Sequence, residues 1–251
     1  MKMQISTRKV IIFLILLVII NSTIFQTIMP NVKAATRSHP IYNVDTDKKD
    51  VAITFDMNWG EDYTLEILNI LDEFDAKATF FVIGSWINYS EDNTNILKEV
   101  KRRGHEIGNH SNTHPDFTKI SKDRILKEIY DTEDKIKDIT GENSKSFRFP
   151  SGAYDNKSLE VSKSTGLYPI HWNVDSIDWK EQGEAIEYNR VTKNLKPGDI
   201  ILFHTNAKYT PNNIRKLLNY LKDKDYKAVK VIDLIYKDNY SIDINGKQIH
   251  N

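Results

Sequence analysis

The chain has 251 residues, in which 35 lysines and arginines balance 35 aspartates and glutamates, and it contains no cysteine. The first 35 residues hold basic but no acidic side chains, so residues 36–251 carry a small excess of negative charge. This excess excludes a general nucleic-acid-binding protein, which needs a basic face to replace the counterions of the phosphates. The absence of cysteine excludes disulfides, thiolate metal ligands, cysteine-ligated iron–sulfur clusters and a cysteine nucleophile.

Residues 1–35 have the pattern of an export leader. Basic residues come first, the apolar run Val10–Ile20 follows, and small residues precede a cleavage point after Ala34. Apolar residues resume between 24 and 29, so an uncleaved membrane anchor of roughly 20 residues is the alternative to a signal peptide. Either way the rest of the chain is expected on the outer, cell-wall side of the membrane, secreted or anchored, with the leader as its only membrane contact.

Short β-rich runs alternate with helical patterns from residue 50 to residue 236, which is the predicted domain. Residues 36–49 are predicted to be a polar linker, and residues 237–251 a polar tail or a loose hairpin around Asn245-Gly246. The strands are expected at Val51–Phe55, Ala78–Ile83, His105–Asn109, Ser146–Phe149, Tyr168–Val174, Asp199–His204 and Ala228–Ile232.

Apolar residues three or four apart predict helices between these strands. The two clearest stripes are Leu65, Leu68, Leu71 and Phe74, and Ile125, Ile129, Ile136 and Ile139. Ser121 is a suitable cap before the second stripe, and Gly141 a suitable stop after it. Strand–helix alternation at this spacing indicates a parallel sheet, and about seven such units without a linker favour one barrel-like α/β domain over two domains.

Polar side chains follow most of the predicted strands at the point where each strand ends. They are Asp56, His110 and His114, Arg148, Asp175 and Asp178, and His204. The carboxyl ends of parallel strands meet at one edge of the sheet, where such folds carry their chemistry. We therefore expect these side chains to share one mouth.

The segment from Gly108 to His114 contains two histidines four residues apart. In a helical turn this spacing places both imidazoles on one face, where they can bind one divalent ion at about 2.1 Å. Capping or solvated histidines are the alternative. Asp56 is a candidate metal ligand or general base; as a helix cap it would compete with the nearer Asp62 and Thr64.

Arg148 lies between two phenylalanines, which indicates a partly closed site where its guanidinium would orient a carboxylate. The turn at Ser151-Gly152 that follows can offer a backbone N–H to a developing oxyanion. Trp172 and Trp179, near two aspartates, suit stacking on sugars, with a core Trp and a surface Asp pair as the alternative. His204 is a candidate general acid, although a hydrogen-bonded core histidine is the commoner outcome.

Taken together, the segments resemble the polysaccharide deacetylase family, also called the NodB-homology domain or carbohydrate esterase family 4. The resemblance runs from Val51 to Ile235 and is nearest to the sporulation-type branch, which has Trp-Gly after its first motif, here Trp59-Gly60. The five matching motifs are Thr54-Phe55-Asp56, His110-Ser111-Asn112-Thr113-His114, Arg148-Phe149-Pro150-Ser151-Gly152, Asp175-Ser176-Ile177-Asp178-Trp179 and Leu202-Phe203-His204.

This resemblance implies a distorted seven-stranded (β/α) barrel that hydrolyses the N-acetyl group of N-acetylhexosamine units, leaving acetate and a free amine. It also implies a divalent metal, with zinc as the expected ion. The implied roles are Asp56 as catalytic base, His204 as catalytic acid, Arg148 as holder of the base, Asp175 as the carboxylate that tunes the acid, His110 and His114 as metal ligands, and Ser151, Trp179 and Leu202 as substrate-binding residues.

Met57 departs from the family pattern, which has a second aspartate there as the third metal ligand. A thioether is a poor ligand for Zn²⁺ and carries no charge to offset the ion. Water can fill the vacancy, another oxygen donor (Asp56, Asn58 or Asp62) can replace the ligand, or the metal can be lost.

The sequence thus predicts a metal-dependent hydrolase that deacetylates a peptidoglycan-like cell-wall polysaccharide. Its expected partner is the polysaccharide, and no nucleic acid. Because of Met57, a catalytically impaired wall-binding or spore-structural protein on the same fold is the first alternative. A hydrolase of another amide or ester is the second.

Overall fold

The computed structural model describes residues 39–60 and 62–251. The predicted leader, residues 1–35, lies outside the described residues and stays a prediction. Within the described part of the chain, no helix has both the length and the apolar character needed to cross a membrane.

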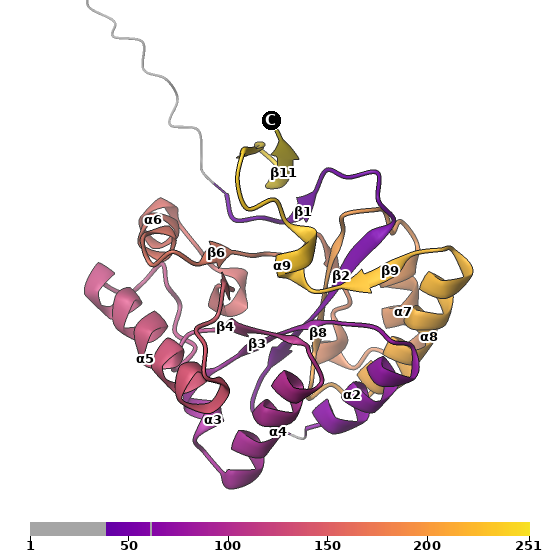
Figure 1. Ribbon diagram of the computed structural model, residues 1–251, viewed down its shortest axis with the longest axis horizontal. Helices are drawn as coiled ribbons and strands as arrows, with labels where there is room; N and C mark the ends of the chain where they lie inside the picture. Colours follow the sequence, from indigo (N-terminus) through magenta and orange to yellow (C-terminus); the bar gives the residue numbers. More distant parts are fainter. Residues whose placement is uncertain (1–38, 61) are drawn as a thin grey trace, which may run out of the picture. The chain divides into compact units, whose positions relative to one another are not determined.

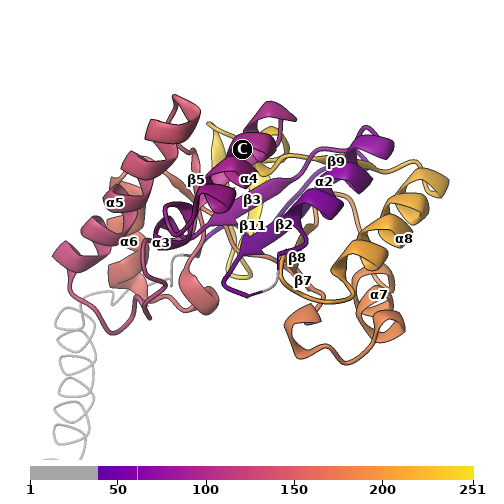
Figure 2. The same cartoon turned by 90° about the horizontal axis from the view of Figure 1, so that it is seen from below.

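A single parallel sheet forms the centre of the domain, in the order β6-β5-β4-β3-β2-β8-β7, with β9 also paired to β2. Figure 1 shows this sheet, and β5 and β7 are labelled in Figure 2. Every pairing in the sheet is parallel. The strands are β2 (Asp50–Met57), β3 (Thr79–Val82), β4 (Glu106–Asn109), β5 (Ser146–Phe147), β6 (Tyr168–Pro169), β7 (Val174–Asp175), β8 (Ile200–His204) and β9 (Lys227–Val229). The sheet curls with helices on its outside, which confirms the predicted distorted (β/α) barrel of about seven parallel strands.

The two faces of β2 separate the core from the site. Successive side chains of a strand point to opposite faces, and Phe55 and Met57 join the large apolar cluster that packs against the helices. Thr54 and Asp56 therefore point to the inner face of the sheet, away from the helices. Met57 is fully buried, and its side chain leaves β2 on the opposite face from Asp56.

The helices cover the outer face of the sheet, with α5 and α6 to one side and α7 and α8 to the other (Figure 2). They are α2 (Thr64–Glu73), α3 (Gly84–Ile87), α4 (Glu91–Arg102), α5 (Lys122–Thr140), α6 (Asn156–Ser164), α7 (Glu184–Thr192), α8 (Thr210–Asp223) and α9 (Val231–Leu234). The predicted limits of α5 are confirmed, because the Ser121 side chain accepts a hydrogen bond from the Arg124 N–H and Gly141 ends the helix at φ +81°. In α2, Leu65 is 46% exposed and Ile67 faces the core, so the predicted stripe was wrong at that position.

One predicted strand, Tyr168–Val174, is in fact two short strands at opposite edges of the sheet. β6 pairs with β5, and β7 pairs with β8. Residues 170–173 cross from one edge to the other, and the His171 N–H on this crossing donates to the Ile41 carbonyl at 2.7 Å. The crossing and the segment around Ile41 thus fill the gap between the two edges.

Residues 39–49 of the predicted linker are part of the folded domain, and so are residues 237–251, which form the predicted hairpin around Asn245-Gly246 and not a polar tail. β1 (Asn43–Val44) pairs with β11 (Lys247–His250), which pairs with β10 (Tyr240–Ile242). Ile41 and Val44 are buried, at 1% and 2% exposure, in a second apolar cluster. Burial of these apolar side chains explains the packing, and Gly246 at φ +83° completes the turn of the hairpin. Figure 1 shows β1 and β11 together beside α9.

Candidate active site

Asp56 and Arg148 form a buried ion pair at the inner face of the sheet. Arg148 Nη1 donates to Asp56 Oδ1 and to Thr54 Oγ1, both at 2.9 Å, and its side chain is fully buried. Burial by itself raises the pKa of Asp56, but the attraction of His110 and Arg148 outweighs burial and leaves that pKa below its usual value. The predicted role of Arg148 as the residue that orients Asp56 agrees with this geometry.

His110 lies next to this pair and presents one free ring nitrogen. The Arg148 carbonyl oxygen, 2.9 Å from His110 Nδ1, can only accept, so Nδ1 donates and Nε2 keeps its lone pair. Burial lowers the pKa of His110 to about 4, so the ring is neutral at neutral pH. Nε2 is buried, lies 3.4 Å from Asp56 Oδ2 and has no hydrogen-bond partner among the described residues. An imidazole held through Nδ1 with Nε2 unpartnered fits a metal ligand.

His114 reaches His110 through a loop rather than through the predicted helical turn. Ser111 and His114 adopt φ of +66° and +57°, and the two imidazole centroids lie 5.0 Å apart. The carboxylate of Glu128, on α5, fixes the loop by accepting from the N–H groups of Asn112 and Thr113 at 2.9 and 2.7 Å. The predicted pair is therefore brought together, but by two left-handed residues and not by helical spacing.

Among the described residues, no third protein ligand joins the two imidazoles. In the described ranges 39–60 and 62–251, no set of three His, Asp or Glu side chains converges as a metal site. Met57 packs in the apolar cluster, and Asp62 Oδ1 accepts from the Thr64 N–H at 2.7 Å. The donors beside one another are thus the two imidazoles, with Asp56 next to His110.

Asp178, and not the predicted Asp175, holds His204. Asp178 is fully buried; its Oδ1 lies 2.7 Å from His204 Nδ1, and its Oδ2 accepts from the His204 N–H at 2.7 Å. Asp175 instead accepts a hydrogen bond from the Ile177 N–H at 2.9 Å, so its carboxylate is bonded within the loop that follows β7. Burial alone lowers the pKa of His204, but the hydrogen bond and charge of Asp178 outweigh burial and raise that pKa above its usual value. Sequence reasoning missed this role because both acids occur in the same motif.

The remaining predicted residues lie around the same mouth. His204 is the register partner of Asp56 on the adjacent strand, and Leu202, 3% exposed, lies two residues before it on the same face of β8. Trp179 is 60% exposed in a 3-10 turn (Asp178–Lys180) after β7. Ser151 is exposed in another 3-10 turn (Pro150–Gly152) after β5, with φ at +53°.

Backbone strain is concentrated in the loops that carry these residues. Eight described non-glycine residues have positive φ, and four of them, Ser111, His114, Ser151 and Ile177, lie in loops of the candidate site. A left-handed conformation is unusual for such residues, above all for β-branched isoleucine. Strain of this kind persists where surrounding contacts over-determine the backbone, and it occurs preferentially at functional sites.

A second buried carboxyl, Glu187 on α7, lies near Asp178. Its Oε2 accepts from Asn213 Nδ2 at 2.8 Å, while Glu187 Oε1 and Asn213 Oδ1 are buried without partners in the described part of the chain. Protonation of Glu187 would supply the donor that these two acceptors lack. Burial and the charge of Asp178 raise the pKa of Glu187 to about 7.

This raised pKa predicts a stability that falls as the pH rises. Between the usual glutamate pKa of 4.5 and about 7, the folded chain keeps a proton that the unfolded chain has lost, so each step up in pH favours unfolding. Glu187→Gln is expected to remove this dependence and to gain stability over the parent from pH 5 to pH 8. Urea unfolding at several pH values measures it, with Glu160→Gln on the exposed face of α6 as control; parallel curves for parent and Glu187→Gln would contradict the prediction.

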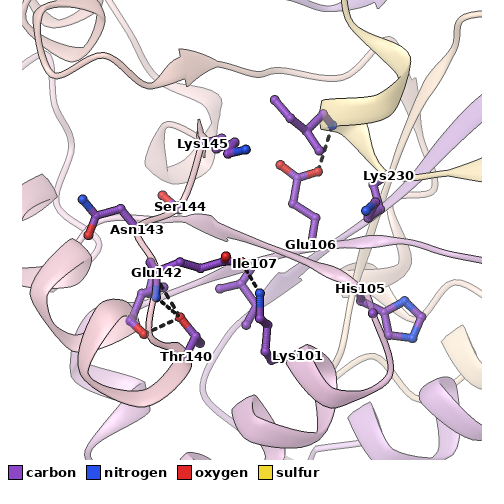
Figure 3. Close-up of a pocket in the computed structure, with 13 residues that line it drawn as sticks. Lys101, His105, Glu106, Ile107, Thr140, Glu142, Asn143, Ser144, Lys145 and Lys230 are labelled. Atoms are coloured by element: carbon purple, nitrogen blue, oxygen red, sulfur yellow. Dashed lines mark hydrogen bonds and ion pairs between the residues drawn. The ribbon is translucent and has the colours of Figure 1, made fainter.

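A separate cavity of about 260 Å³ lies at the amino-terminal end of β4 (Figure 3). Lys145 and Lys230 lie on either side of Glu106 there, while Lys101 pairs with Glu142. The Glu106 carboxylate already accepts three hydrogen bonds. The predicted site residues lie at the other, carboxyl ends of the strands, and none of them lines this cavity.

Known proteins resemble the chain across this site. The sequence pattern of the polysaccharide deacetylase family matches residues 43–170, which include Asp56, both site histidines and Arg148. Peptidoglycan-N-acetylmuramic acid deacetylase PdaA of Bacillus subtilis is 30% identical over 200 residues, covering 78% of this chain and 75% of that protein. Peptidoglycan-N-acetylglucosamine deacetylase PgdA of Listeria monocytogenes is 34% identical over 80% of this chain, which spans 41% of PgdA.

Among solved structures, BA3943 of Bacillus anthracis, described as a CE4 family pseudoenzyme, superposes with a TM-score of 0.73 at 30% identity. The match covers 84% of this chain and 72% of that one. A BA3943 mutant described as having restored enzymatic activity matches equally well, with a TM-score of 0.73. On these matches, and on the geometry above, the chain belongs to the polysaccharide deacetylase family of hydrolases, carbohydrate esterase family 4.

Proposed function

We propose that this protein removes N-acetyl groups from N-acetylhexosamine units of cell-wall peptidoglycan. The observation that carries the proposal is the pairing of Asp56 with His204 on adjacent strands, each fixed by a buried partner of opposite charge. Amide hydrolysis requires an ionised base and a protonated acid at the same end of the barrel. The named activities of PdaA and PgdA support this substrate class, and for such a substrate we propose that the protein acts on the cell-wall side of the membrane.

The reaction follows from the protonation states of the two groups. Asp56, held ionised by Arg148, takes a proton from the attacking water. His204, whose protonated form Asp178 favours, gives a proton to the departing amine, which would otherwise leave as a very poor leaving group. The N–H at Ser151 is the proposed donor to the developing oxyanion. Exposed Trp179 is proposed to stack on a sugar ring, and Leu202 to line the acetate pocket.

Deacetylases of this family generally depend on a divalent metal ion, and the two imidazoles fit one. We propose that His110, through its unpartnered Nε2, and His114 hold the ion, with zinc as the expected metal. When bound, such an ion polarises the acetamide carbonyl and makes a water more acidic. With two imidazoles as the protein ligands, we expect weaker binding than at a three-ligand site, because no second carboxylate offsets the charge.

The position of Met57 favours one alternative, a non-catalytic wall-binding protein on the same fold. Its side chain is buried in the apolar cluster, and the similar BA3943 is described as a pseudoenzyme. Acetate release from N-acetylated peptidoglycan, measured on a preparation of known metal content, separates the two functions. Acetate release that a chelator abolishes supports the deacetylase; sugar binding without acetate release supports the alternative.

Replacing Asp178 tests the assignment of the acid's partner. Asp178→Asn is expected to lower kcat about 100-fold, because His204 loses the charge that raises its pKa. The alkaline limb of the pH–rate profile should move to lower pH. Asp175→Asn is the matched control: the charge of Asp175 also raises the pKa of His204, but less than Asp178 does, so this variant should move the profile less and keep most of the rate. A larger loss from Asp175→Asn than from Asp178→Asn would return the role to Asp175.

A further inference from the structure

The guanidinium of Arg148 has one anchor that does not belong to a strand. Its Nη1 bonds to Thr54 and Asp56 on β2, whereas its Nη2 donates to the carbonyl oxygen of His171 at 3.1 Å. His171 lies on the crossing between β6 and β7, outside the named strands of the sheet, and this crossing is paired through Ile170 and the His171 N–H with the segment at Ile41. The orientation of the guanidinium, and with it that of Asp56, therefore depends on where this crossing lies.

Besides these backbone bonds, a stack of rings holds the crossing in place. The His171 ring lies between Tyr42, at 4.1 Å and 11° between planes, and Trp172, at 4.0 Å and 22°. A Cβ at Gly152 would lie only 2.7 Å from His171 Nε2 and 2.8 Å from Trp172 Cη2, so the loop after β5 packs closely on the stack. Burial lowers the pKa of His171 to about 4, which leaves the stacked ring uncharged at neutral pH.

Tyr42 is in turn fixed by the carboxyl-terminal hairpin. Its N–H donates to the Gly246 carbonyl at 2.9 Å, and a Cβ at Gly246 would collide with the Tyr42 ring. The Tyr42 hydroxyl lies 3.2 Å from the Tyr154 hydroxyl. Backbone bonds of the preceding Ile41 to Pro169 and His171 align Tyr42 with the crossing. A continuous set of contacts thus runs from the hairpin through Tyr42 and His171 to Arg148.

We propose that Tyr42 is a positioning residue for the catalytic base: its ring holds the His171 carbonyl in place, and this carbonyl orients the Arg148 guanidinium that holds Asp56. The catalytic consequence rests on the proposed function, but the effect on Arg148 does not. The segments that the sequence predicts as a linker and a tail would then be parts of the active site. A misplacement of about 1 Å at a reacting group can cost up to about 100-fold in rate.

Three substitutions separate positioning from simple support of the fold. Tyr42→Leu keeps apolar bulk but removes the ring that stacks on His171, and Tyr42→Phe keeps the ring. Tyr236→Leu is the matched control, because Tyr236 packs against His250 and donates to the Asp45 carbonyl at 2.9 Å without a ring contact to His171. If Tyr42→Leu does not fold, Gly246→Ala replaces it, since the new methyl group displaces the same ring.

The direct readout is NMR of the Arg148 guanidinium in protein with labelled arginine, assigned with Arg148→Lys. We expect slow rotation and separate Nη resonances in the parent, Tyr42→Phe and Tyr236→Leu, and averaged resonances in Tyr42→Leu. On the glycan, Tyr42→Leu should lower kcat about tenfold or more with KM within about twofold, and Tyr42→Phe should restore it. Averaged Arg148 resonances in Tyr236→Leu as well, or unchanged Arg148 resonances in Tyr42→Leu, would overturn the proposal.

A parent protein without deacetylase activity would refute the proposed function. The NMR comparison would then still decide whether Tyr42 positions Arg148.

Discussion

Arg148→Met is expected to destabilise the fold by about 3–5 kcal/mol at neutral pH, because it leaves the Asp56 carboxylate buried without its partner. Arg148 is fully buried and Asp56 is 4% exposed, so water cannot replace the lost ion pair. Without the guanidinium, burial raises the pKa of Asp56 above that of the unfolded chain. The loss of stability should therefore shrink as the pH falls and the carboxyl takes up a proton.

The double variant Arg148→Met, Asp56→Leu is the control for this prediction. Replacing both members of a buried ion pair by apolar side chains is often neutral, whereas removing one member is not. Denaturant unfolding of the parent, both single variants and the double variant gives the coupling between the two positions. A double variant as unstable as the sum of the two single variants would show that the charges of Arg148 and Asp56 do not interact.

Asp56→Asn is expected to lower kcat about 1,000-fold, measured on protein that denaturant unfolding shows to be folded, because the substitution also leaves the Arg148 charge buried without its carboxylate. The amide has the shape of the carboxylate and its oxygen can still accept from Arg148 Nη1, but it cannot take a proton from water. Asp62→Asn is the matched control, since Asp62 follows the same strand and its amide oxygen can still cap the Thr64 N–H. Acetate release from N-acetylated glycan measures both. An Asp56→Asn protein with a tenth or more of the parental rate would exclude Asp56 as the base.

Much of the fold could be predicted from local patterns. The buried strands β2, β3 and β8 are apolar runs, and α5 is marked by its Ser121 cap and its Gly141 stop. The packing of residues 39–49 and 237–251 could not be predicted, because it depends on pairings about 200 residues apart, such as Asn43 with Lys247. Few apolar residues in either segment signal that contact.

The membership of the site could be predicted better than its geometry. Strand ends identified Asp56, His110, Arg148 and His204, because a parallel sheet brings its carboxyl ends together. Which acid holds His204 depends on the turn at Ile177, and a φ of +54° at an isoleucine is not a conformation that sequence preferences indicate. The role of Asp178 as the partner of His204 was missed for this reason.

The sequence alone shows Met57 at the position where the family has its third metal ligand. The structure adds where the Met57 side chain points. Met57 does more than omit a carboxylate, since its side chain contributes to the apolar cluster between β2 and the helices. Restoring an acid there places a charge against apolar neighbours unless a metal or a turn of the side chain compensates. Met57→Asp is therefore informative for metal binding only together with a stability measurement.

The most direct test of the account is acetate release from N-acetylated peptidoglycan by the purified protein, with metal content determined on the same sample. We predict that the protein carries a divalent ion, releases acetate, loses this activity to a chelator and regains it when the ion is added back. A metal-free protein that releases no acetate, but gains both ion and activity in a Met57→Asp variant whose stability is measured alongside, would contradict the deacetylase function and favour a wall-binding role.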